Sequence, residues 1–298
     1  MNKKLIFYTV ALTAGLLTAC SSDDEQKQEP PVRHISVEVN QRPMTSDDPA
    51  GARSTDTRSA ITTTETFSAF SMRGIYSNLT SEYSVSKSND TWTVTPNRWP
   101  EDGYGIIAPN ETKVPFYAFT DGTFYASGTP YISFTIAENA STQHDLLVAT
   151  NTVSFNDHQG KVPLTFDHAC AALAFNVQIT NTLKTNKLSN GTLTVNSIVL
   201  RNVSNSGKYY FGTSTWGDVS GSAYYTLTNG NITVDTEAQA LSSNYLFVIP
   251  QRSEATYLYV TYTFTGQTKT SATIPLSVNW EAGKQYTINI KLGSTLIQ

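Results

Sequence analysis

Cysteine is nearly absent from this chain of 298 residues, which contains only Cys20 and Cys170. Cys20 lies in an export signal described below, so Cys170 has no partner for an intrachain disulfide. Cys170 sits among Ala169, Ala171 and Ala172, and no signature places a base beside it. We therefore interpret Cys170 as a small buried apolar residue and not as a reactive thiol.

Long stretches with apolar residues at helical spacing are missing, and so is a stripe of Lys and Arg. The formal net charge is −4, with charges of both signs dispersed along the chain. A nucleic-acid partner is therefore not expected. Val, Ile, Thr, Tyr and Phe instead recur in short runs separated by Gly, Asn, Asp and Ser, which favours antiparallel strands joined by turns.

Catalytic signatures are missing too, since there is no P-loop, G-x-S-x-G, G-x-G-x-x-G or C-x-x-C motif and no H-x-x-x-H helix. We expect no enzymatic activity, no cofactor and no metal ion. Three of the four histidines have an Asp neighbour: His144-Asp145, Asp157-His158 and Asp167-His168. Adjacent residues of a strand point to opposite faces, so we interpret these pairs as polar residues at turns and module edges. Two sets of carboxylates, Glu101 with Asp102 and Asp235 with Glu237, could in principle form a glycosidase pair. Such a pair is defined by the distance between its carboxylates in space, which the sequence does not give.

The first 19 residues have the pattern of an export signal, with Lys3 and Lys4 ahead of the apolar run Leu5–Leu17. This run is short for a membrane span. The following Leu17-Thr18-Ala19-Cys20 resembles the lipobox of bacterial lipoproteins, in which the cysteine after the cleavage site receives lipid. We predict a lipoprotein signal peptide over residues 1–19 with lipidation at Cys20; the alternative is an ordinary signal peptide with an incidental cysteine.

Residues 20–34 are charged and contain proline, so we expect a lipidated flexible tether without packed structure. Its acidic start, Ser21–Glu25, resembles the surface-export signal of Bacteroidota lipoproteins. The resemblance implies a protein anchored by lipid to the outer membrane and exposed at the cell surface.

A first β module is predicted over residues 35–160. Its first strand, His34–Asn40, alternates apolar and polar residues, and the following Gln41–Thr57 is polar with Pro and Gly, as expected of a long loop. Ser88-Asn89-Asp90 indicates a hairpin. The other predicted strands of this module are Phe67–Ile75, Tyr83–Val85, Trp92–Val94, Val114–Phe119, Tyr131–Ile136 and Leu146–Ala149.

A second β module is predicted over residues 161–298, after the polar connection Asn156–Lys161. Apolar residues alternate in Val162–Phe166 and again in Leu173–Ile179, but with the opposite parity, which requires a bulge or short turn between the two runs. The clearest strand is Tyr286–Leu292, in which Ile288 and Ile290 are predicted core residues. The remaining predicted strands are Leu193–Val203, Tyr209–Phe211, Ala223–Leu227, Ile232–Val234, Tyr245–Ile249, Tyr257–Phe264 and Thr273–Leu276. We expect an all-β protein of two consecutive β-sandwich modules, of transthyretin-like or Greek-key type.

Four stretches carry a family resemblance: Asp145–Ile179, Leu246–Gln251, Asn279–Leu292 and Phe116–Phe119. Their sequences, DLLVA followed by VPLTFDHACAALAFNV, then LFVIPQ, NWEAGKQYTINIKL and FYAF, resemble the Mfa-like fimbrillins, fimbrillin-like lipoproteins of Bacteroidota-type bacteria. The similarity spans roughly the whole mature chain and contains no catalytic signature.

The resemblance implies a fimbrial subunit or adhesin that assembles with other fimbrial subunits by strand donation. In that family a cut at a basic residue removes an N-terminal strand, and another subunit's strand fills the groove. Arg53 and Arg58 are the candidate cut sites, and Arg58 is the better positional match. After Leu292 only Gly293–Gln298 remain, too few for an extra strand to reach a neighbour. We therefore expect a tip or accessory subunit.

Aromatic loops offer an alternative function. Trp99 with Tyr104, and Trp216 with nearby tyrosines, are candidate ligand-binding side chains that would stack on sugar rings or hold a host or bacterial surface protein. The alternative is a surface glycan-binding lipoprotein of a polysaccharide-uptake system. Aromatics that cover the open ends of a sandwich would have the same pattern.

Overall fold

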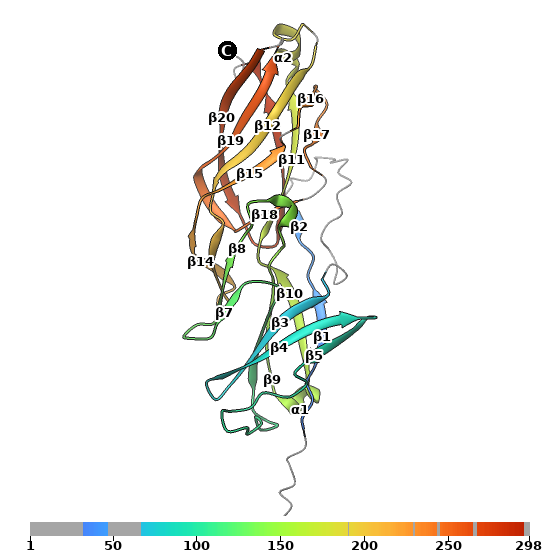
Figure 1. The fold of residues 1–298 in the computed structure, drawn as a ribbon, viewed down its shortest axis with the longest axis vertical. Coiled ribbons are helices and arrows are strands. Elements are labelled where there is room, and N and C mark those ends of the chain that lie inside the picture. Colours follow the sequence, from blue (N-terminus) through green and yellow to red (C-terminus); the bar gives the residue numbers. More distant parts are fainter. Residues whose placement is uncertain are drawn as a thin grey trace, which may run out of the picture. The chain divides into compact units, whose positions relative to one another are not determined.

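The structure is a computed structural model that describes residues 32–46, 67–189, 191–228, 230–242, 245–264 and 267–294, with backbone alone for residues 264 and 267–272. It is almost entirely β, as predicted (Figure 1). Within these ranges no helix is long and apolar enough to cross a membrane. The predicted signal peptide, Cys20, Arg53 and Arg58 lie outside the described residues.

The first half of the described chain builds a seven-stranded sheet in the order β1-β10-β9-β6-β3-β4-β5. Its strands are β1 (Ser36–Gln41), β3 (Ala69–Tyr76), β4 (Leu79–Ser88), β5 (Thr91–Thr95), β6 (Val114–Phe119), β9 (Leu147–Val153) and β10 (Lys161–His168). β1 runs parallel to β10, and the other pairs are antiparallel. β1 and β5, at opposite ends of this order, contact each other, so the sheet curls around its own core.

The predicted β4–β5 hairpin is confirmed. Asn89 and Asp90 have φ angles of 48° and 63°, the left-handed values that a tight turn between two right-twisted strands requires. Short polar side chains tolerate this region better than other L-residues, which explains the Asn-Asp pair.

The second half forms a sandwich around a larger core. Among the described residues, one sheet has the order β17-β11-β21-β2, with β18 also paired to β11, and the facing sheet has the order β15-β12-β19-β20, with β16 paired to β12. The strands of the first are β2 (Thr45–Ser46), β11 (Ala171–Ile179), β17 (Gln239–Ala240), β18 (Leu246–Val248) and β21 (Lys284–Leu292). The strands of the second are β12 (Leu193–Val203), β15 (Ala223–Thr228), β16 (Ile232–Val234), β19 (Gln251–Phe264) and β20 (Gln267–Trp280).

A smaller sheet draws strands from both halves of the sequence. Its order in the described chain is β14-β13-β8-β7, with β7 (Thr123–Tyr125), β8 (Tyr131–Thr135), β13 (Ser206–Tyr210) and β14 (Thr215–Ser220). Ile132 of β8 belongs to the second core although it precedes β9 of the first sheet. The two cores are therefore not separated at a single point of the sequence.

The boundary expected at residue 161 falls between β9 and β10, which are neighbours in one sheet. The chain leaves the first sheet for the last time at Ala169–Cys170, between β10 and β11. This crossing also explains the change of apolar parity, because the two strands bury side chains in different cores. The polar connection before β10 is a helical turn, α1 (Phe155–His158), that ends at Gln159 in the left-handed conformation.

Some elements carry no clear alternation and were not expected from the sequence. They are β2, β7, β14, β17, the short helix α2 (Asn181–Asn186) and the 3₁₀ turn η2 (Ala140–Thr142). In the predicted final strand, Ile290 and Leu292 are 4% and 3% exposed, whereas Ile288 is half-buried against the same core. Cys170 is fully buried, as predicted.

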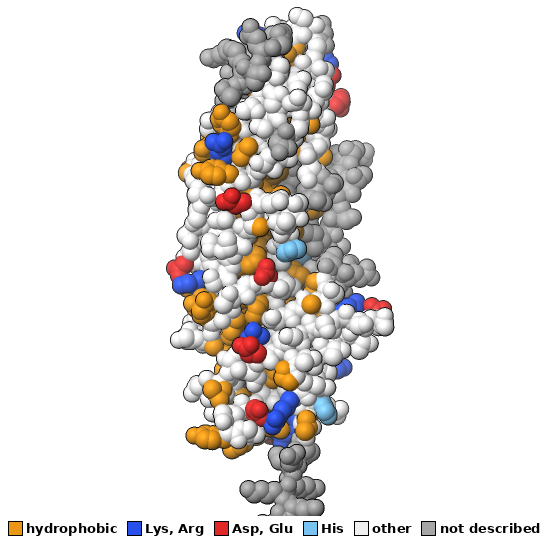
Figure 2. All heavy atoms as spheres, viewed as in Figure 1, with side chains coloured by type: hydrophobic (Ala, Val, Ile, Leu, Met, Phe, Trp, Pro, Cys, Tyr) orange, Lys and Arg blue, Asp and Glu red, His pale blue; other side chains and the backbone are white. Residues whose placement is uncertain are grey.

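Charged residues make up 15% of the chain. On the face in Figure 2, basic and acidic groups lie singly or in small mixed sets, with no band of one sign.

Candidate functional site

One stretch, Arg33–Ser46, lies on the edges of two different sheets, and we define it as the N-terminal segment. Its β1 pairs in parallel with β10, from Ser36 opposite Lys161 to Gln41 opposite Phe166. Its β2 pairs in parallel with β21, with Thr45 opposite Lys284. Both are terminal strands of their sheets within the described residues, and the segment is the blue ribbon along the first sheet in Figure 1.

The inward side chains of the segment complete both cores. Ile35 is 3% exposed, and Val37 and Val39 pack half-buried against the core of the first sheet. Met44 is 6% exposed and belongs to the core of the second sandwich. Full burial of such a side chain contributes about 1.5–3 kcal/mol, so removing the segment would expose apolar surface in two places.

Backbone hydrogen bonds hold the segment along its length. The amide of Ser36 donates to Gly160 at 3.0 Å, that of Arg42 to Phe166 at 2.9 Å, and that of Thr45 to Gly283 at 2.9 Å. Gly160 has a φ of +81°, and a Cβ there would lie 2.4 Å from the carbonyl oxygen of His34. Glycine is therefore needed where the segment approaches the turn before β10.

The start of the segment is held by the loop after β5. Arg33 donates from Nη1 to the carbonyl of Ala108 at 2.6 Å, and the amide of Ile35 donates to Oδ1 of Asn97 at 2.8 Å. The amide of Trp99 in turn donates to the carbonyl of Arg33 at 2.7 Å. These contacts fix where β1 begins along the edge of β10.

A buried polar cluster lies under the middle of the segment. Nε2 of Gln41 is 3.1 Å from Nε2 of His168, and Nδ1 of His168 contacts the Asp145 carboxylate. The His168 and Asp145 side chains are 1% and 7% exposed. Burial raises the pKa of the Asp145 carboxyl, and its hydrogen bond with His168 acts against this. We assign the Nδ1 proton of His168 to a hydrogen bond with Asp145, which leaves Nε2 to accept from the Gln41 amide.

Cys170 lies beside this cluster. Burial raises the pKa of its thiol well above the ordinary value, and the Asp145 carboxylate acts in the same direction. A thiol held in the protonated form is a poor nucleophile. The sequence reasoning missed the pairing of His168 with Asp145, because it considered only Asp and His residues that are adjacent in the chain.

A second contact at this position lies on the surface. Nη1 of Arg42 is 2.6 and 2.7 Å from the two carboxylate oxygens of Asp167. The two side chains are 66% and 47% exposed, so the pair contributes at most about 1 kcal/mol. The inner face of the segment therefore holds it more firmly than this ion pair does.

The predicted ligand-binding aromatics do not form a common site. Trp99 is 1% exposed and packs on the rings of Phe116 and Phe155, with centroid distances of 5.3 and 5.4 Å. Trp216 is half-buried and donates its indole N–H to the carbonyl of Ala169 at 2.7 Å. Tyr104 is 92% exposed. Both tryptophans pack within the protein, and the structure leaves only Tyr104 of the three fully open to a ligand.

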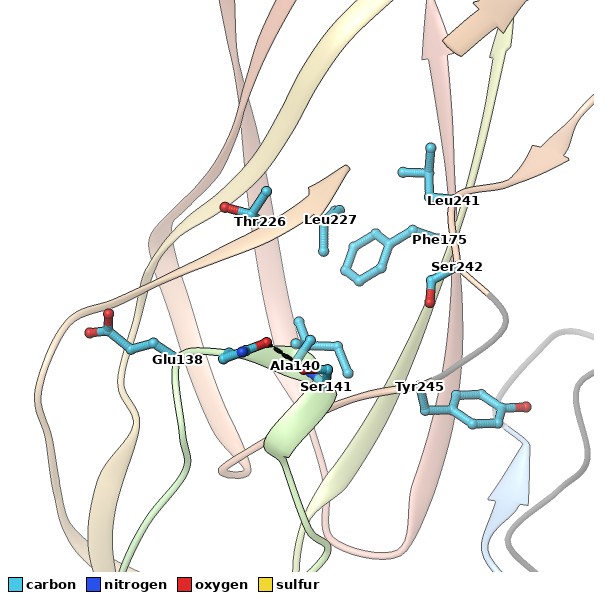
Figure 3. Close-up of a pocket in the computed structure, with 11 residues that line it drawn as sticks. Glu138, Ala140, Ser141, Phe175, Thr226, Leu227, Leu241, Ser242 and Tyr245 are labelled. Atoms are coloured by element: carbon cyan, nitrogen blue, oxygen red, sulfur yellow. Dashed lines mark hydrogen bonds between the residues drawn. The ribbon is translucent and has the colours of Figure 1, made fainter. Parts of the chain in front are cut away.

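A cavity of about 510 Å³ opens on another side of the second sandwich (Figure 3). Phe175 of β11 and Leu227 of β15 face each other across it, with Leu241 beside them and Glu138 at its rim. It borders the β17 end of the sheet whose opposite end is β2. It is therefore separate from the sheet edges that the N-terminal segment covers, and no predicted site residue lines it. The described residues hold no group of three potential metal ligands.

The comparisons with known proteins point to one family. A family model described as fimbrillin-like matches residues 37–298. The fold resembles a crystal structure of a fimbrial protein from Bacteroides vulgatus, with a TM-score of 0.57 and 19% identity over 87% of this chain and 95% of that one. It also resembles a candidate cell adhesion protein from Parabacteroides distasonis, with a TM-score of 0.53 and 8% identity over 89% and 90% of the two chains. Among curated protein sequences, none matches.

Proposed function

Since this chain belongs to the fimbrillin-like family, we propose that it is a cell-surface fimbrial subunit or adhesin that accepts a strand of another subunit in place of its N-terminal segment. The observation that carries the proposal is the position of this segment. It covers two cores with alternating inward side chains, and it pairs with each sheet along one edge only in the described chain. An extended chain of similar pattern would form the same backbone hydrogen bonds.

The candidate cut sites fit this arrangement. Arg53 and Arg58 follow β2, which ends at Ser46, and precede β3, which begins at Ala69. A cut at either residue would separate the segment covalently from the rest of the fold. The edges of β10 and β21 would then be unpaired on one side, and unpaired edges readily take up another strand.

The lipid anchor adds a consequence. Cys20 precedes the N-terminal segment, so lipid attached there would be joined to the segment and not to the remainder of a cut chain. Noncovalent contacts of the segment would then hold the cut subunit at the outer membrane. Exchange of the segment for another subunit's strand would transfer the subunit from its lipid anchor to the fibre.

The tip or accessory role is supported by the last described strand. β21 is paired with β11 over eight residues, from Gln285 opposite Ala172 to Leu292 opposite Ile179, and its other edge holds β2. β21 is thus part of the acceptor and is not available as a donor. A subunit that accepts a strand and donates none would end a fibre.

Limited trypsin digestion followed by electron microscopy tests this function. We expect the folded protein to be cut first near Arg53–Arg58, and antibody against it to label the ends of surface fibres. The matched control is Arg53→Gln with Arg58→Gln, which keeps the segment attached and should not enter fibres. Long homopolymers of the purified, cut protein would contradict the tip role, and uncut subunits within native fibres would contradict strand exchange.

A further inference from the structure

We propose that the groove under the N-terminal segment selects its incoming strand by a buried polar position, so that the partner strand carries a Gln-like side chain where Gln41 now lies. This inference rests on the proposed function, because it specifies the chemistry of the strand that would replace the segment. The ligand is an extended strand of another subunit, parallel to β10, with alternating apolar residues that lead to one half-buried amide.

The inward positions of the segment define the pattern. Ile35, Val37 and Val39 point into the first core, and Gln41 is the next residue with the same parity. Met44 follows in the second core. The partner strand is therefore apolar at three alternate positions, polar at the fourth, and apolar again three residues later.

The polar position is fixed from below by residues that are not part of the segment. His168 lies at the end of β10 and is 4% exposed, and Asp145 lies just before β9. Asp145 bonds to Nδ1 of His168 and so fixes the orientation of the ring. Nε2 therefore points toward the segment, where Gln41 is its hydrogen-bond partner. An apolar side chain at this position would leave that nitrogen buried without a partner.

This polar contact determines the register in a way that apolar alternation does not. A slip of one residue moves every inward side chain to the outer face, and alternation alone prevents it. A slip of two residues preserves the alternation, so each apolar side chain would take the place of its inward neighbour with little penalty. It would also carry Gln41 away from His168 and place an apolar residue over the polar cluster. The pair thus distinguishes the correct register from the even-numbered slips.

The contact also discriminates between partner strands. An unpaired buried acceptor is costly enough to lower affinity about tenfold or more. Strands with purely apolar inward faces, which satisfy the rest of the groove, would be disfavoured by this factor. Selectivity of this kind requires a buried polar group that only the correct partner satisfies.

Peptide exchange on a cut protein tests the inference. Residues 21–298 are expressed with a specific protease site between residues 47 and 66, cut, and separated from the segment in mild denaturant. Fluorescent peptides of residues 33–46 are then added, and binding is followed by anisotropy and by recovery of the folded circular-dichroism spectrum. We expect the native peptide to bind, and the Gln41→Leu peptide to bind at least about tenfold more weakly.

The matched control is the Asn40→Leu peptide, which places the same apolar group on the exposed face of β1. It should bind within about threefold of the native peptide, because it leaves the buried cluster intact. A second variant, the protein with His168→Leu, should reverse the preference and favour the Gln41→Leu peptide. If that protein does not fold, the peptide series on the native chain still decides the matter.

The outcomes separate the two proposals. If no peptide binds and none restores the folded spectrum, strand acceptance fails and the selection fails with it. If the native and Gln41→Leu peptides bind equally well, the groove accepts strands but the polar selection is wrong.

Discussion

The indole N–H of Trp216 donates to the carbonyl of Ala169 at 2.7 Å, which joins β14 to the point where the chain leaves the first sheet for the second sandwich. Trp216 also packs edge-on against Tyr209, at a centroid distance of 5.7 Å. An aromatic residue with these contacts supports the connection between β10 and β11.

Trp216 substitutions should therefore affect stability. Trp216→Phe removes the hydrogen bond to a part-buried carbonyl and should lower the free energy of unfolding by about 1–3 kcal/mol, measured by urea denaturation. Tyr104→Ala changes an exposed side chain and should stay within about 0.5 kcal/mol of the native protein. Glycan-array binding that Trp216→Phe abolishes, with no loss of stability, would instead support the glycan-binding alternative.

The predicted lipidation of Cys20 gives a test that depends only on the sequence. Cys20→Ser should release the protein from membranes or block its processing, because the serine hydroxyl does not provide the thioether to lipid. Metabolic palmitate labelling of cells checks this. Labelling that persists in the variant would show that lipid is attached elsewhere.

The two isoleucines of β21, Ile288 and Ile290, should contribute unequally to the free energy of unfolding. Ile290→Ala should lower the free energy of unfolding by about 2–5 kcal/mol, because the side chain is almost fully buried. Ile288 is half-buried, so Ile288→Ala should cost clearly less. Urea denaturation of both variants measures the difference, and equal losses would mean that the two positions are equally enclosed.

The capping box at the start of α1 makes the stability of the fold depend on pH, and the direction of this dependence follows from the pKa shift of Asp157. Asp157 accepts from the amide of Ser154, and the Asp157 amide donates to the Ser154 hydroxyl, both at 3.3 Å. The bonds with Ser154, and to a smaller extent the charge of Lys113, lower the pKa of the Asp157 carboxyl from 3.8. Its contribution to stability is therefore present above that value and lost as pH falls through the lower pKa of the folded state.

We expect the melting temperature of the Asp157→Asn variant to fall less steeply than that of the native protein as pH is lowered from about 5 to about 2. Adding Ser154→Ala to this variant should cause no further change in the slope, because both residues belong to one capping box. If the melting temperatures of the native protein and the Asp157→Asn variant fall equally steeply over this pH range, the assignment is wrong.

The local sequence predicted most strands, because a strand that buries one face and exposes the other alternates apolar and polar residues. The alternation in Tyr286–Leu292 gave the correct facing for Ile290 and Leu292, and Asn89-Asp90 identified a hairpin. β14 has no such alternation, since Gly217 and Asp218 interrupt it and Asp218 has a φ of 50°. The strand forms through its pairing with β13, which local sequence does not encode.

The candidate site could be predicted only in part from the sequence, because its contacts join residues that are far apart along the chain. Alternation predicted that the first strand exists, but not that it runs parallel to β10. The parity change near His168 indicated a break, and its cause is a passage between two cores. The pairing of His168 with Asp145 requires β9 and β10 to be neighbours, so no spacing rule identifies it. The same holds for Trp99, whose burial follows from the fold around its loop.

The parallel pairing of β2 with β21 also sets an order of events in folding. Thr45 and Lys284 are partners from opposite ends of the described chain, and bringing such distant residues together is slow because the closed loop is long. A chain that emerges from its N-terminus exposes β2 early, whereas β21 arrives last. The edge of β21 is therefore the final part of the sheet to be covered. For that interval the edge of β21 lacks its partner strand, and under the proposed strand exchange another subunit's strand would have to reach it before the chain's own β2 does.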